Sequence, residues 1–159
     1  MPSTKSDIVR PPAVTGRFYP ADPGLLRADI ERLIAAVGPV SEPLAAAYIA
    51  PHAGYRYSGP VAAEVYARLA AHRGRVKRVV LVGPSHHHPL RGHAAAPYAR
   101  WRTPLGEVRA APTNVVGYSR LPHEAEHSLE VQLPFLQVAL GDDIEVTPVA
   151  CGSWTSSEC

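Results

Sequence analysis

The segment VKRVVLVG, residues 76–83, decides the fold class. Its β-branched residues are typical of a central strand in a parallel sheet. Before it, residues 60–71 (PVAAEVYARLAA) have the apolar periodicity of a helix, and residues 45–50 (AAAYIA), closed by Pro51, form an apolar run that suits a buried strand. Two parallel strands joined by a crossover helix make a βαβ unit. We therefore expect an α/β fold with a mostly parallel or mixed sheet flanked by helices.

The chain before this unit is expected to contain a leader and a helix. Residues 1–12 have the polar and proline-containing character of a flexible leader. Apolar residues then recur at helical spacing, and Asp22 and Pro23 stand where an N-cap and a first-turn residue are favoured. We therefore predict a helix over residues 25–37.

The chain after this unit adds elements of the same class. Residues 107–111 and 144–150 are predicted strands, and residues 128–140 have the periodicity of an amphipathic helix with a kink at Pro134. The tail, residues 153–159, is polar and lacks periodicity. A sheet that ended there would keep a face or edge uncovered. We therefore expect a truncated chain whose fold is incomplete at the C-terminus.

Composition excludes several classes of function. With 159 residues, of which 46% are hydrophobic and 19% charged, the chain fits one globular domain. Its net charge of +2 comes with no basic stretch, which disfavours nucleic-acid binding. No apolar run reaches the roughly 18 to 20 residues of a membrane span, and no signal peptide is evident. The only cysteines, Cys151 and Cys159, are too close together for a disulfide framework. A cytoplasmic protein is expected.

Histidines follow both strands of the predicted βαβ unit. His52 comes one proline after the 45–50 strand, and His86 follows the 76–83 strand in the segment GPSHHH. Loops at the carboxyl ends of parallel strands meet at one edge of the sheet, where ligands bind. If the two strands are close neighbours, both imidazoles can converge on one metal ion. The alternative is a structural role, in which each histidine is a hydrogen-bonded residue that binds no metal.

A third loop, HEAEHSLE at residues 123–130, carries a further cluster. A histidine beside carboxylates can be a metal ligand, a general base or a group that orients a ligand, and spacing does not decide among these roles. The alternative is a helix N-terminus enriched in acids, capped by Ser128. We take His127 and Glu126 as catalytic candidates and His123 as a substrate-binding candidate.

The first two loops hold the remaining candidates. Tyr55 and Tyr57 lie between two glycines, where the backbone can approach a ligand closely. They are either core residues or walls of a substrate pocket. His87, in GPSHHH, is the remaining catalytic candidate.

Six motifs stand in order along the chain and cover about residues 11–152. They are PAVTGRFYP, IAPHAGYRYSGPVAAEVY, VVLVGPSHHHPL, WRTPLGEV, HEAEHSLEVQLPFLQ and VTPVACG. Together they resemble the motifs of the Memo family, called AmmeMemoRadiSam system protein B in bacteria and archaea. The resemblance implies that residues 13–152 are the N-terminal part of a single Memo-like domain.

The resemblance implies a fold similar to that of the class III extradiol dioxygenases, with iron(II), or alternatively copper, bound at the carboxyl edge of the sheet. The family's first two histidine ligands match His52 and His86. Its third ligand, a cysteine, and an Asp/His-containing segment have no counterpart in this sequence. Weak metal binding is therefore expected unless His127, Glu126 or a second chain contributes.

Three functions follow from these residues. The first is a metal-dependent redox enzyme of the dioxygenase type, acting on an unknown substrate through His127, Glu126 and His87. The second is a non-catalytic module that binds a peptide or protein in the same cleft, and the third is an inactive fragment. The family resemblance adds a radical SAM protein and an AMMECR-type protein as partners by analogy alone.

Overall fold

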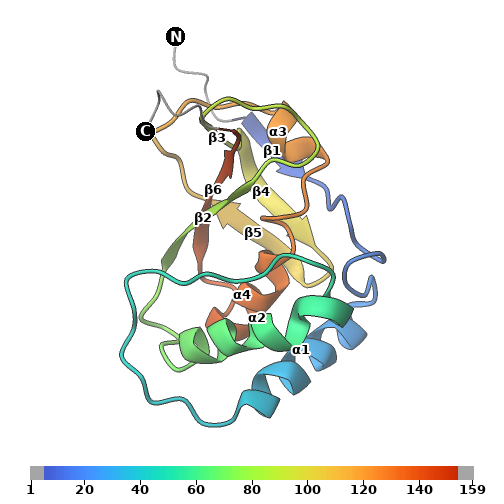
Figure 1. The fold of residues 1–159 in the computed structure, drawn as a ribbon, viewed down its shortest axis with the longest axis vertical. Helices are drawn as coiled ribbons and strands as arrows, with labels where there is room; N and C mark the ends of the chain where they lie inside the picture. The colour runs from blue at the N-terminus through green and yellow to red at the C-terminus, as the bar shows by residue number, and fades with distance from the viewer. Residues whose placement is uncertain (1–5, 154–159) are drawn as a thin grey trace.

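A mixed sheet is the centre of this computed structural model, which describes residues 6–153 (Figure 1). The described strands follow the order β1-β4-β5-β6-β2, and β3 pairs with β6 outside this path. The strands are β1 (Ser6–Arg10), β2 (Arg78–Pro84), β3 (His93–Ala95), β4 (Tyr98–Thr103), β5 (Gly106–Ala110) and β6 (Glu145–Cys151). The helices are α1 (Pro23–Val37), α2 (Tyr55–Ala70), α3 (Leu121–Glu124) and α4 (Gln132–Leu140). The predicted α/β class with a mixed sheet is confirmed.

Two parallel strands set the edge at which the site forms. β2 and β6, each seven residues long, pair in parallel along their whole length and so end at the same edge of the sheet. β5 also runs parallel to β6, whereas β4 is antiparallel to β5. The strands predicted at residues 76–83, 107–111 and 144–150 are therefore confirmed.

The strand predicted at residues 45–50 is wrong. This segment and β2 line a common cavity of about 650 Å³, but no backbone hydrogen bond joins them in the part of the chain that the structure describes. Three consecutive alanines have a low strand propensity, and Ile49 of this segment is 96% exposed. The crossover between two neighbouring strands that the sequence indicated is therefore absent.

The flexible leader predicted at residues 1–12 is corrected from residue 6 onward. β1 pairs in parallel with β4, and Arg10 at its end is only 1% exposed. A strand of five residues is too short to show a clear alternation in the sequence. Residues 1–5 of the expected leader, and residues 154–159 of the expected tail, lie outside the described residues.

The first helix forms as its sequence predicts. α1 begins at Pro23, and the side chain of Asp22 accepts a hydrogen bond from the backbone N–H of Leu25 at 2.8 Å. α2 begins at Tyr55, ahead of the predicted start at residue 60, and includes Pro60. The early start places the end of the first histidine loop at the helix N-terminus.

The last helix is shorter than predicted. α4 covers Gln132–Leu140, and the preceding residues 128–131 form a turn. Pro134 lies in the first turn of α4, where its missing N–H needs no partner within the helix. The predicted kink at Pro134 is therefore not required.

The helices α1, α2 and α4 pack on one another beside the sheet, while α3 lies near β1 (Figure 1). A continuous apolar core joins these helices to the sheet, and within it the Tyr66 and Phe135 rings stack at 4.7 Å. Among the helices of residues 6–153, none combines the length and the apolar character needed to cross a membrane.

Candidate metal centre

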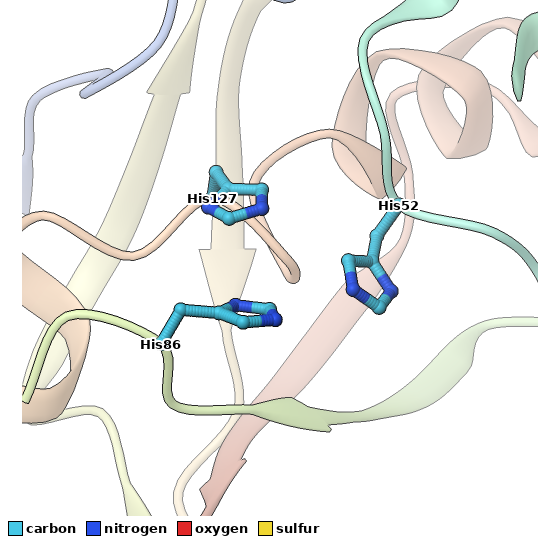
Figure 2. A group of neighbouring side chains, drawn as sticks. All are labelled: His52, His86 and His127. Carbon is cyan, nitrogen blue, oxygen red and sulfur yellow. The ribbon is translucent and has the colours of Figure 1, made fainter. Parts of the chain in front are cut away.

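Three histidines from three separate segments meet beyond the end of β2. His52 lies just before α2, His86 follows β2, and His127 follows α3. Figure 2 shows the three imidazoles gathered round a common space. The ring centroids of His52 and His86 lie 5.3 Å apart, those of His86 and His127 4.7 Å apart, and those of His52 and His127 5.9 Å apart. The predicted convergence of His52 and His86 is confirmed, although the strand expected before His52 is not there.

The nitrogens of these rings are close enough for one ion. One nitrogen from each histidine lies within 4.8 Å of the nitrogens of the other two. Metal–imidazole bonds of about 2.0–2.1 Å place nitrogens that share an ion up to about 4 Å apart. To share one ion at these bond lengths, the three nitrogens would each have to move by about 1 Å or less.

The Glu126 carboxylate holds His86 by hydrogen bonds. This carboxylate, 1% exposed, accepts hydrogen bonds from Nδ1 of His86 at 2.9 Å and from the backbone N–H of His86 at 2.5 Å. It also accepts hydrogen bonds from the backbone N–H groups of His127 and Ser128, both at 2.9 Å. Burial raises the pKa of Glu126, but these hydrogen bonds outweigh burial and lower it to about 2. The charged carboxylate keeps the proton of His86 on Nδ1 and leaves the lone pair of Nε2 free for a metal.

His127 has an unsatisfied ring nitrogen. Its buried Nδ1 has no hydrogen-bond partner, although it lies 3.3 Å from Oε1 of Glu126, in a geometry that makes no hydrogen bond. The Phe18 ring packs against the imidazole with centroids 4.8 Å apart. Such an orphaned buried atom is uncommon in proteins, and it lies on the side of the ring that is near Glu126.

The imidazoles of His52 and His127 favour the neutral form that ligates metals. Burial lowers the pKa of His127, as do the neighbouring histidines, with Glu126 opposing them. Burial and then His86 lower the pKa of His52, again against Glu126. Neutral imidazole is the ligating form, so the observed donor set fits a first-row transition metal.

His87 stands at the open side of the same cluster. It is exposed, and its ring meets the His127 ring edge-on at 5.6 Å. His87, Glu126 and His127 form a second group whose ligand atoms lie within 4.8 Å of one another. All three catalytic candidates therefore lie at the site, with Glu126 committed to hydrogen bonds and His87 open to solvent.

The three substrate-binding candidates lie in different surroundings. Tyr57 is 79% exposed and lines a hollow beside His52 and His127. Tyr55 is buried and donates its hydroxyl proton to the carbonyl of Val131 at 2.7 Å. His123 is fully buried, and Nε2 lies 3.0 Å from a backbone carbonyl. Only Tyr57 is placed to touch a ligand in this arrangement.

The hollow next to the cluster is open and largely apolar. Its volume is about 880 Å³, and Ile49, Tyr57 and Val61 on its walls are 96%, 79% and 62% exposed. Phe18 and Arg17 complete the wall. Neither of these two was selected from the sequence as a site residue, because only the fold brings residues 17–18 next to His52.

Comparison with known proteins points to one family. A family model described as "Memo-like protein" matches residues 10–158. A MEMO1 family protein of Ignicoccus hospitalis is 40% identical over 168 residues, which cover 94% of this chain and 59% of that protein. A MEMO1 family protein of Aeropyrum pernix is 44% identical over 161 residues, covering 89% of this chain and 56% of the relative. The chain thus spans a little over half the length of these relatives.

Proposed function

The chain belongs to the Memo family, and on that premise we propose that it binds one first-row metal ion through His52, His86 and His127. The observation that carries the proposal is the meeting of three imidazoles round one space, with one nitrogen from each within 4.8 Å of the others. In this proposal His127 supplies the third imidazole of the set.

Iron(II) is the proposed metal, with copper as the alternative. Imidazole suits both ions, and three protein ligands leave coordination positions open. An Fe(II) ion with open positions would supply O₂ activation for an oxidation of the dioxygenase type. An all-imidazole set provides no anionic ligand, so we expect weaker binding than at a site with a thiolate or carboxylate.

The side chains round the metal have separate tasks in this proposal. Glu126 fixes the ring orientation and the proton of His86, and Phe18 shields one face of His127 from water. His87, whose ring contacts that of His127, would exchange a proton with a bound substrate. Tyr57 lines the hollow through which that substrate would approach.

Metal content and oxygen uptake test the proposal. The protein is loaded anaerobically with Fe(II), desalted and assayed for iron, and O₂ uptake is then followed. We expect about one iron per chain, lost in the His52→Ala, His86→Ala double variant and reduced in His127→Ala. His88→Ala is the matched control from the same loop, because His88 belongs to neither ligand group. Absence of iron in the unaltered chain, or equal iron in the double variant, would contradict the proposal.

A second candidate function is a binding module without catalysis. The exposed apolar side chains of Ile49, Tyr57 and Val61 favour it, because apolar patches of this kind mark binding sites. Arg17 on the rim would favour a small apolar anion.

The fluorescent anion anilinonaphthalene sulfonate distinguishes the two functions. If the hollow is a metal-independent module, metal-free protein binds the dye, Ile49→Lys with Val61→Lys abolishes binding, and His52→Ala does not. Binding that requires iron would support the enzyme. Association with a radical SAM protein or an AMMECR-type protein remains a proposal by family analogy.

A further inference from the structure

We propose that the buried ion pair between Arg10 and Glu130 is a positioning device for the metal site, which sets the place of Glu126 and, through it, of His86 and His127. The inference rests on the proposed function, because it assigns the pair a role in that site. Neither residue belongs to the candidate ligand groups.

Glu130 fastens the N-terminal segment to the loop before α4. Its fully buried carboxylate accepts hydrogen bonds from the Arg10 guanidinium at 2.6 Å and from the Tyr19 hydroxyl at 2.7 Å. It also accepts hydrogen bonds from the backbone N–H groups of Ala13 and Val14, at 2.8 and 3.0 Å. One carboxylate therefore fixes the course of residues 10–19, which carry Phe18 to the face of His127.

Arg10 fastens the loop that carries Glu126 and His127. Its Nε donates to the carbonyl of His123 at 2.7 Å, and a terminal nitrogen donates to the carbonyl of Glu126 at 2.6 Å. The guanidinium also lies over the Trp101 ring, 4.2 Å from its centroid. The planar fork thus bonds to Glu130 and to both carbonyls at once, which a lysine ammonium on a single flexible stem cannot reproduce.

The contact at Glu126 connects the ion pair to the site. Arg10 donates a hydrogen bond to the backbone carbonyl of Glu126. The carboxylate of Glu126 in turn accepts hydrogen bonds from His86 and from the backbone N–H of His127. A shift of this backbone therefore moves the carboxylate that orients His86. Groups behind a metal ligand commonly affect metal affinity by about 10- to 100-fold.

Stability alone does not account for such a pair. Desolvation of both charges offsets much of their attraction, so well-packed apolar residues often stabilise a core as well as a buried ion pair does. The fork geometry of Arg10 is specific in a way that apolar packing is not. Its target is the loop that carries His127, one of the three proposed ligands.

Arg10→Lys tests the proposal, because it keeps the charge and removes the fork. The matched control is Arg100→Lys, which alters an exposed ion pair with Glu107 on the sheet surface. Three quantities are measured: the dissociation constant for Co(II), the visible absorption spectrum of the Co(II) complex, and the tautomer of His86 in metal-free protein, which is followed by ¹⁵N NMR. Glu130→Gln serves as a second variant, and far-UV circular dichroism and urea unfolding report whether each variant is folded.

We expect Arg10→Lys to weaken Co(II) binding by about 10-fold or more, to change the Co(II) spectrum, and to move the His86 tautomer away from pure Nδ1–H. Arg100→Lys should leave all three unchanged. A folded Arg10→Lys protein with an unaltered Co(II) constant and an unaltered His86 tautomer would overturn the proposal, even if its stability had fallen. If the unaltered chain binds no Co(II), the proposed function fails, and the tautomer measurement alone decides on the positioning role.

Discussion

Replacement of Arg10 by methionine should destabilise the protein more than most single substitutions. The guanidinium is 1% exposed and Glu130 is fully buried, so the variant would keep a buried carboxylate without its cation. Two backbone carbonyls, those of His123 and Glu126, would also lose their donor. Methionine keeps an unbranched side chain of similar volume but loses the cation–π contact with Trp101, so the loss is mainly electrostatic.

The size of the effect follows from the contacts that remain. Removal of one partner of a buried ion pair costs about 3–5 kcal/mol. Glu130 retains three hydrogen-bond donors, from Ala13, Val14 and Tyr19. We therefore expect the free energy of unfolding to fall by about 4 kcal/mol, and not by more than this range allows. Because a domain has about 5–15 kcal/mol of stability in total, the variant would remain folded with a small margin.

Urea unfolding, followed by circular dichroism, measures this free energy. The double variant Arg10→Met, Glu130→Gln contains no uncompensated buried charge, and its loss should be smaller than the sum of the two single losses by about 2 kcal/mol. A loss of under about 1 kcal/mol for Arg10→Met, or strictly additive single losses, would refute the view that the pair is electrostatically coupled.

Three further predictions concern other parts of the molecule. Burial lowers the pKa of His123 to about 4 from an ordinary value of 6.5, so the unfolded chain takes up a proton first as pH falls. Stability should therefore drop by about 3 kcal/mol between about pH 6.5 and 4 and depend less on pH in His123→Gln. In Gly83→Ala, a new Cβ would lie 2.9 Å from Leu129 and 3.0 Å from Oγ of Ser128, so thermal unfolding should show a loss of about 1–3 kcal/mol. Val80→Lys and Val82→Lys should each change stability by no more than about 0.5 kcal/mol, because these side chains are 67% and 63% exposed; a large loss would show that this face of β2 is covered.

The sequence allowed His52 and His86 of the three-histidine cluster to be chosen for reasons that were only half right. His86 follows a strand that the β-branched run predicted, and its place beyond β2 is confirmed. His52 was placed by a strand that does not form. It reaches the site because it lies just before α2, whose N-cap is Gly54, so the start of a helix, rather than a strand end, sets its position.

Other features could not be predicted, because they depend on contacts far apart in the chain. Arg10 and Glu130 are separated by 120 positions, and the sequence round one of them does not indicate the other as its partner. His123 and His127 are neighbours in the sequence and so appeared to belong to one site. The short helix α3 places His123 in the core and leaves His127 beside His52 and His86, a separation that periodicity does not reveal over so few residues.

The coordination number of a bound ion is the most direct test of the central claim. X-ray absorption spectra of Zn(II)-loaded protein, with zinc as a stand-in that undergoes no redox chemistry, count the imidazoles and give Zn–N distances. We predict three imidazole nitrogens at about 2.0–2.1 Å, falling to two in His127→Ala. A protein that binds no zinc, or a spectrum that His127→Ala does not change, would contradict the three-histidine centre.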